Sequence, residues 1–130
     1  MSSAQMIQDP RVQLAITISS GTSVSSGIEM MGYTPIALIV SNSTWSSAAI
    51  SFVGCHDNTS FVPVYSDTAE VSISSALTKG MGKTFSFRAD YARVLGGYSF
   101  IKVRSGLAAA AVNQAKDVPM ILVVAPYRPG

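Results

Sequence analysis

Charged residues are scarce in this chain. Asp, Glu, Lys and Arg together make up 12% of its 130 residues, about half the share found in an ordinary globular protein. Apolar residues reach 48%, which excludes intrinsic disorder, and Ser and Thr contribute 28 residues. The surface must therefore consist largely of Ser, Thr, Gly and Ala. This composition suits a protein that is bound to other protein molecules better than it suits a free monomer.

Cysteine and histidine are represented by one residue each, Cys55 and His56. An internal disulfide is therefore excluded, and the two residues are too few for a zinc site. Adjacent side chains on a strand point to opposite faces, so we do not expect Cys55 and His56 to form a catalytic pair. The oxygens of Asp57–Thr59 could surround a calcium ion, although no spacing requires it. We predict no enzyme, no catalytic or metal-binding residue and no cofactor.

Long hydrophobic runs are also missing from the sequence. The longest apolar stretches are Ile36–Val40, Leu107–Val112 and Ile121–Ala125, whereas a membrane helix needs roughly 18–20 residues. Met1–Pro10 has neither the basic nor the apolar region of a signal peptide. We therefore expect neither a membrane partner nor secretion.

The hydrophobic pattern has a period of two along most of the chain. In Val12–Ile18, apolar residues alternate with Gln13, Ala15 and Thr17, which predicts a half-buried strand. Ile36–Val40 is a short uninterrupted apolar run, typical of a central strand. In all, about eight or nine strands separated by turn residues are expected, and this pattern predicts an all-β antiparallel sandwich or barrel.

Little helix is expected. Leu107–Val112 has high helix propensity but is too short to hold a helix alone, so we predict a loop with one helical turn. Tyr91–Leu95 is a second candidate for such a turn. No linker interrupts the pattern, which indicates one β-sandwich domain over residues 11–130 with a short C-terminal tail, preceded by an N-terminal arm, residues 1–10.

The two halves of the chain differ in charge. Residues 1–70 hold five acidic residues and one basic residue, a net charge of −4, and residues 71–130 hold eight basic and two acidic residues, a net charge of +6. Such complementarity can hold copies of a chain together, so one hypothesis is a homo-oligomer, most simply a dimer. The alternative is that the two halves interleave in space and their charges mix.

Basic and aromatic residues lie close together in the C-terminal half, which is one pattern of nucleic-acid binding. The net charge of the whole chain is only +2 and the aromatic residues fall at core-facing positions, so we expect no nucleic-acid partner. The residues concerned are Arg88, Arg93, Lys102, Arg104, Phe87, Tyr91, Tyr98 and Phe100. The single tryptophan, Trp45, is expected either to close one end of the sandwich or to serve as a platform for a sugar.

Two segments together resemble small virion proteins of tailed bacteriophages. The first is Trp45–Asp57 (WSSAAISFVGCHD), and the second is Tyr98–Gly106 (YSFIKVRSG) with the following Asn113–Asp117 (NQAKD). Cys55 stands where those proteins usually carry serine, and Asn58 where glycine is common. The resemblance extends over roughly residues 12–125 and marks strands and turns rather than a site.

The resemblance implies a jelly-roll-like β-sandwich in a virus particle, most similar to a capsid decoration, or cement, protein. Such a protein is made in the host cytoplasm and lies on the outer capsid surface, where non-covalent contacts with the major capsid protein and with its own copies stabilise the shell. The alternative is a tail or fibre component with a receptor- or glycan-binding role. The interface residues that we predict are Trp45 and, in the C-terminal tail, Tyr127 and Arg128, which are of the types that dominate interfaces.

Overall fold

The computed structural model of the chain describes residues 11–30, 32–40, 49–73 and 83–126. The predicted arm, residues 1–10, and residues 127–130 of the predicted C-terminal tail lie outside these ranges. The three predicted interface residues, Trp45, Tyr127 and Arg128, also lie outside the described residues. Within the described ranges, no helix has the length and apolar character needed to cross a membrane.

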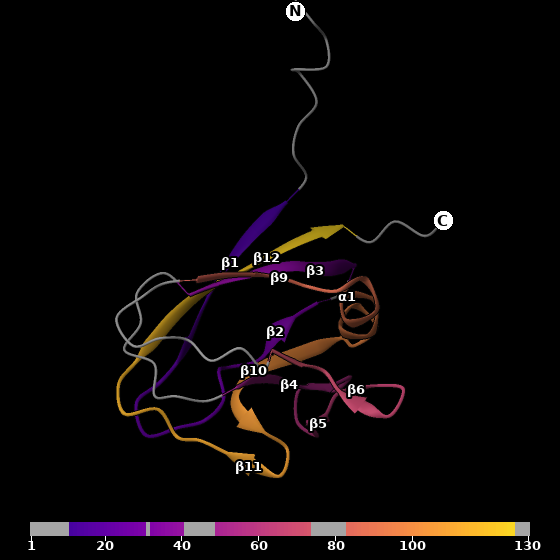
Figure 1. Cartoon of the computed structure of the whole chain (residues 1–130). Helices are drawn as coiled ribbons and strands as arrows, with labels where there is room; N and C mark the ends of the chain where they lie inside the picture. Colours follow the sequence, from indigo (N-terminus) through magenta and orange to yellow (C-terminus); the bar gives the residue numbers. More distant parts are fainter. Residues whose placement is uncertain (1–10, 31, 41–48, 74–82, 127–130) are drawn as a thin grey trace, which may run out of the picture.

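Two antiparallel sheets lie face to face and form a sandwich (Figure 1). The four-stranded sheet comprises, in spatial order, β1 (Val12–Ile18), β12 (Val118–Pro126), β3 (Tyr33–Val40) and β9 (Lys83–Ser86). The six-stranded sheet comprises β2 (Ile28–Glu29), β10 (Phe100–Leu107), β4 (Ile50–Cys55) and β5 (Val62–Pro63), with β11 (Ala110–Ala111) beside β10 and β8 (Ser72–Ile73) beside β4. A separate hairpin pairs β6 (Tyr65–Ser66) with β7 (Ala69–Glu70).

The order of the strands is that of a jelly roll. The separate hairpin β6–β7 and the two accessory strands β8 and β11 can be set aside, which leaves eight strands. Of these eight, the four-stranded sheet contains the first, eighth, third and sixth. The other sheet contains the second, seventh, fourth and fifth, and all pairings are antiparallel. Eight strands shared in this way between two sheets form the double Greek key of a jelly roll. The predicted all-β antiparallel sandwich is confirmed.

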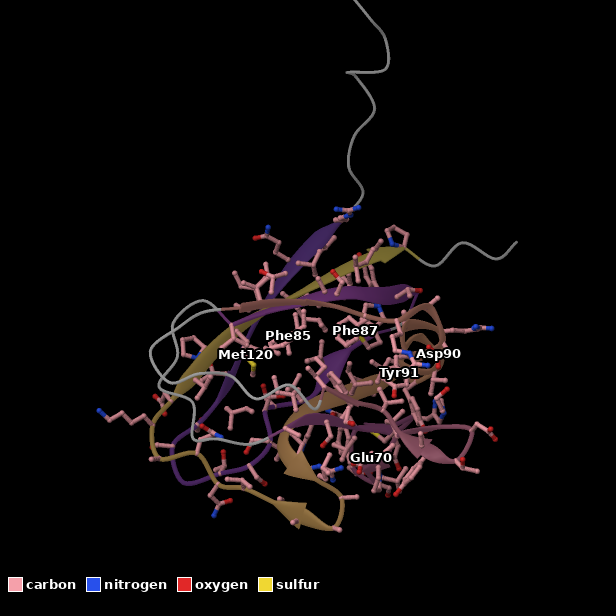
Figure 2. The ribbon with its side chains drawn as sticks, viewed as in Figure 1. Glu70, Phe85, Phe87, Asp90, Tyr91 and Met120 are labelled. Carbon is pink, nitrogen blue, oxygen red and sulfur yellow. The ribbon has the colours of Figure 1, made fainter. Side chains whose placement is uncertain are left out.

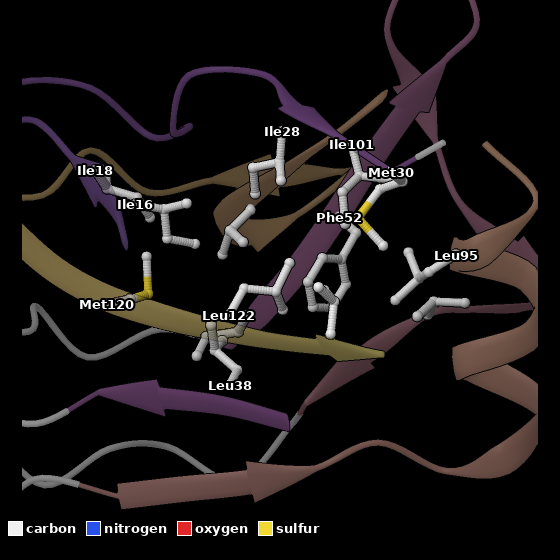
Figure 3. Packing of buried hydrophobic residues seen from close by; sticks show 14 of the residues in the cluster. Ile16, Ile18, Ile28, Met30, Leu38, Phe52, Leu95, Ile101, Met120 and Leu122 are labelled. Carbon is white, nitrogen blue, oxygen red and sulfur yellow. The ribbon is translucent and has the colours of Figure 1, made fainter. Parts of the chain in front are cut away.

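The core lies between the two sheets, where the alternating apolar residues of the strands meet (Figure 3). On β1, Ile16 and Ile18 are buried while Thr17 between them is exposed, as a half-buried strand requires. Phe52 on β4 is fully buried, and its ring centroid lies 5.6 Å from that of Phe87. Other fully buried core residues are Leu38, Val40, Ile101, Val103, Val118, Leu122 and Val124.

One helix, α1 (Ala89–Gly96), closes an end of the sandwich (Figure 1). It is longer than the single turn expected at Tyr91–Leu95, because tertiary packing supplies what a short helix lacks in isolation. Leu95 anchors the helix in the core with no exposed area, and Asp90 in the first turn interacts favourably with the helix dipole.

The prediction of a helical turn in Leu107–Val112 is wrong. The segment instead forms the end of β10, a two-residue turn and β11, so that Gly106 and Leu107 pair with Ala111 and Ala110. Gly106 has φ +90, and a Cβ there would lie 2.4 Å from the carbonyl oxygen of Ala110. A glycine in this left-handed conformation lets the strand turn sharply, and the cross-strand pairing outweighs the helix propensity of the alanines.

Candidate interaction surfaces

The side chains of Cys55 and His56 point apart, as expected for neighbours at the end of a strand. Cys55 is buried, and its Sγ accepts a hydrogen bond from the backbone N–H of Asn58 at 3.0 Å. His56 is exposed and stacks on Tyr98 with 5.5 Å between ring centroids, while its Nδ1 lies 3.2 Å from Ser99 Oγ. Among the residues that the structure describes, no three His, Cys, Asp or Glu side chains come together as metal ligands would.

The loop after β4 is held by its own carboxylate. Asp57 Oδ1 accepts hydrogen bonds from the backbone N–H groups of Thr59, at 3.0 Å, and Ser60, at 2.9 Å. These bonds lower the pKa of Asp57 from its ordinary value of 3.8 to about 2, and the bond from Ser60 contributes more than the bond from Thr59. Asn58 has φ 59, a conformation that Asn adopts more readily than most residues. The Oδ1 oxygen of Asp57 thus closes the turn.

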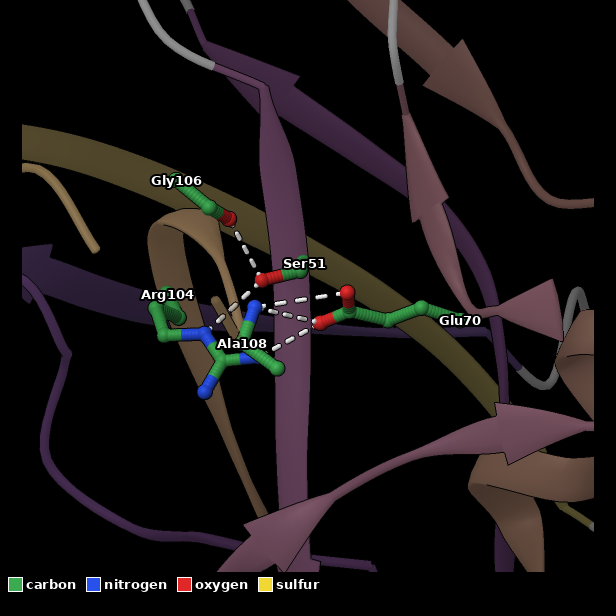
Figure 4. Close-up of polar contacts among 5 residues, drawn as sticks. All are labelled: Ser51, Glu70, Arg104, Gly106 and Ala108. Atoms are coloured by element: carbon green, nitrogen blue, oxygen red, sulfur yellow. Dashed lines mark hydrogen bonds and ion pairs between the residues drawn. The ribbon is translucent and has the colours of Figure 1, made fainter. Parts of the chain in front are cut away.

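Arg104 lies in a buried polar network rather than on a binding surface (Figure 4). Its Nε donates to Ser51 Oγ at 2.9 Å, and its terminal nitrogen lies 2.6 Å from Glu70 Oε2. Ser51 Oγ in turn donates to the carbonyl of Gly106 at 2.6 Å, and the backbone N–H of Ala108 donates to Glu70 at 3.0 Å. The network therefore joins β4, β7 and β10 to the turn that leads into β11.

Two other basic residues of the C-terminal half, Arg88 and Lys102, are engaged locally. Arg88 forms an exposed ion pair with Asp90 at 3.1 Å and also lies over the ring of Tyr91, 4.5 Å from its centroid. Lys102 lies 4.3 Å from the centroid of Phe61. Arg104, one of the four basic residues considered for nucleic-acid binding, is thus withdrawn from the surface.

Over the strand residues whose side chains the structure describes, the outer side of the four-stranded sheet carries no ionisable side chain. We call outer face a set of ten exposed or half-exposed residues that alternate with core residues along β1, β12, β3 and β9. They are Gln13, Ala15, Thr17, Ala37, Ile39, Thr84, Ser86, Pro119, Ile121 and Val123. Figure 2 shows Phe85 and Met120, from the opposite side of the same sheet, pointing into the sandwich.

The strand register arranges most of the outer face in two rows across the sheet. One row consists of Ala15, Ile121, Ile39 and Thr84, and the next of Gln13, Val123, Ala37 and Ser86. Aliphatic side chains thus occupy the two central strands, and small or uncharged polar side chains occupy the two outer strands. Such a face can be covered by another protein without dehydrating a charge and with little loss of side-chain entropy.

The acidic and basic halves of the sequence interleave in space. β1 and β3, from the first half, both pair with β12 from the second half, and β4 pairs with β10. Each sheet therefore mixes strands from both halves. This interleaving is what the alternative of mixed charges requires.

Comparison with known proteins yields weak structural similarities only. No family model matches the sequence, and no curated protein is significantly similar to it. The SPBc2 prophage-derived protein YomS is similar in structure, with a TM-score of 0.47 and 15% identity over 91% of this chain and 96% of that protein. The coat protein of tobacco streak virus, solved as a dimer, has a TM-score of 0.39 and 10% identity over 95% of this chain and 91% of that protein. At these values, neither similarity is evidence for the function of this chain.

Proposed function

We propose that this chain is a structural protein of a bacteriophage virion, and more specifically a capsid decoration protein. It binds the outer capsid surface through non-covalent contacts with the major capsid protein and with its own copies, and it thereby stabilises the shell. It performs no bond-making step and needs no cofactor.

The observation that carries this proposal is the uncharged outer face of the four-stranded sheet. The jelly-roll fold alone does not decide the function, since it occurs in viral capsid proteins, lectins and other proteins. An exposed sheet face with Ile39, Ile121 and Val123 at its centre and no ionisable side chain is unusual for a free monomer. A surface that is permanently covered by protein needs such an apolar centre and no unpaired charge. The resemblance of the sequence to phage virion proteins supports the same assignment.

The size of the outer face indicates how such a protein works. Four strands about 4.8 Å apart and about seven residues long, at ~3.4 Å per residue, cover roughly 450 Å². A stable interface needs about 800 Å² from each partner. One copy bound through this face alone is therefore weakly held, whereas many copies linked to one another on a regular shell gain in strength through multivalency.

The test uses virions of the phage that encodes the chain and particles in which its gene is deleted. Adding back the purified wild-type chain should restore its presence on the particles and raise the temperature at which they release DNA. Ile121→Lys, which places a charge at the centre of the outer face, should bind at least ~10-fold more weakly. Thr84→Lys places a charge at an exposed position of the same face and should weaken binding less than Ile121→Lys does.

Thr68→Lys is the matched control, because Thr68 is exposed in the turn between β6 and β7, away from the outer face. It should bind and protect the particles as the wild type does. Circular dichroism and thermal unfolding of each variant separate a lost contact from a lost fold. The proposal fails if the chain is missing from virions, or if Ile121→Lys and Thr68→Lys bind equally well. A chain found only in the tail would favour the alternative of a tail component.

A further inference from the structure

The strand β1 is an open edge of the four-stranded sheet. One side of β1 pairs with β12 over its full length, from Val12 to Ile18, without a bulge. On the other side, a bridge between Ile18 and Ser25 closes one end. From Val12 to Thr17, no strand of the described ranges lies beside it. Among the described residues, no strand pairs with its backbone groups on that side, so the edge can accept another strand.

The other described sheet edges are protected, whereas β1 is not. Natural proteins guard edges by making the strand short, or by placing a proline, a charge or a bulge in it. The edge strands β2, β5 and β11 have two residues each, β5 contains Pro63, and β9 has four residues and contains Lys83. β1 has seven residues, and none of them is charged or a proline.

A groove runs along the open edge. It has a volume of 390 Å³ and lies between β1 and the segment Ser26–Glu29. Its walls are mixed: the side chains of Val12, Leu14, Ile28 and Tyr33 are apolar, whereas Ser26 and Glu29 add polar surface. Burial along β1 decreases toward the groove's open end: Ile16 and Ile18 are buried, but Val12 and Leu14 are only half-buried. The first half of β1 is thus the part of the core wall that the described chain leaves uncovered.

We propose that the β1 strand of a second copy occupies this edge, paired antiparallel about a two-fold axis perpendicular to the sheet. A pairing centred on Leu14 sets Val12 of one copy opposite Ile16 of the other, and Gln13 opposite Ala15. Residues directly opposite in an antiparallel pair share a face. The apolar inner residues of each copy then extend into the groove of the other, and the uncharged outer residues stay on the outer side, so the strand is complementary to itself.

The dimer would extend the surface on which the proposed function rests. Pairing β1 with β1 joins two four-stranded sheets into one of eight strands. The two outer faces then form one surface of roughly 900 Å², twice the area of a single copy, which reaches the size of a stable interface. The paired edge, Val12–Ile16, is only about 17 Å long, so we expect a dissociation constant in the micromolar range rather than a permanent dimer.

The test compares the oligomeric state of the isolated full-length chain with that of Leu14→Lys. In the monomer, a lysine at this half-buried position can run its stem along the groove and keep its ammonium in water. In the dimer, the same ammonium is sealed between two copies. Sedimentation over a wide concentration range should show that the wild type dimerises and that Leu14→Lys does so at least ~100-fold more weakly. Val62→Lys, on the edge strand β5 where Val62 is 50% exposed, is the matched control and should dimerise normally.

Hydrogen exchange of the β1 amides gives a second readout that does not depend on a variant. Amides on the open side of β1 should become protected as the protein concentration rises through the dissociation constant. Protection that is independent of concentration would mean that another part of the same chain covers the edge, and would overturn the proposal. A wild type that stays monomeric, or a Leu14→Lys dimer as stable as that of the wild type, would overturn it as well.

The outcome for β1 can be separated from the outcome for the proposed function. If the dimer is absent but the wild-type chain binds virions and Ile121→Lys does not, the decoration role stands and only the β1 pairing is lost. If the dimer forms but the chain is missing from virions, the pairing stands and the decoration role is lost.

Discussion

Replacing Arg104 with methionine removes a buried charge and leaves its partner in place. The side chains of Arg104 and Glu70 are only 10% and 14% exposed, and among the described residues the variant leaves Glu70 with the backbone N–H of Ala108 as its donor. Breaking a buried ion pair by removing one partner costs about 3–5 kcal/mol, and the slight exposure of this pair places it near the lower end. For a domain of this size, ~3 kcal/mol corresponds to a decrease in Tm of roughly 10 °C.

Thermal unfolding at pH 7, followed by circular dichroism or calorimetry, measures this loss. Arg88→Ala is the matched control, since Arg88 and Asp90 form an ion pair with 67% and 38% of their side chains exposed, and its loss should cost less than ~1 kcal/mol. Combining Arg104→Met with Glu70→Gln should recover part of the stability, because the unpaired carboxylate is gone. The reasoning is refuted if Arg104→Met unfolds within a degree or two of the Arg88→Ala control, or if the double variant is less stable than the single one.

Three further predictions concern turns and close contacts. The Asp57 carboxyl should titrate near pH 2 in an NMR titration, and a midpoint near 3.8 would show that the turn bonds are absent. Because the pKa of Asp57 is lowered on folding, its contribution to stability is present above pH 3.8 and is lost as the pH falls toward 2. Gly54→Ala should destabilise the fold by about 1–3 kcal/mol in thermal unfolding and disturb the ring contact of Tyr98 with His56, because the new Cβ would lie 2.7 Å from the Tyr98 ring. Gly106→Ala should lower the free energy of unfolding more than Gly54→Ala in the same assay, because φ of Gly106 is +90 and the new Cβ would meet backbone atoms. An equal or smaller loss of stability would show that the turn does not depend on this glycine.

The strand pattern could be predicted because it is a local property of the sequence. Alternation in Val12–Ile18 is visible in any window of a few residues, and the structure has a strand with these bounds. The hairpin at Leu107–Val112 could not be predicted in the same way, because the local preference of four alanines is for helix. Its conformation depends on the pairing of Gly106 and Leu107 with residues across the turn.

The features most important for function depend on long-range pairing. Ile121–Ala125 reads as an uninterrupted apolar run, so nothing in it reveals that Ile121 and Val123 face outward while Leu122 and Val124 are buried. The outer face exists only once β12 lies between β1 and β3. Arg104 and Glu70 are 34 residues apart in the sequence, and no spacing rule connects them.

The central claim is that the uncharged outer face of the four-stranded sheet is covered by protein in the virion. A cryo-EM map of the virion of the encoding phage, at a resolution that shows side chains, tests it directly. We expect this chain on the outer capsid surface, with Ile39, Ile121 and Val123 within about 4.5 Å of atoms of a neighbouring subunit. A particle in which these three side chains face water, while the chain is held through its His56–Ser60 loop or another surface, would contradict it.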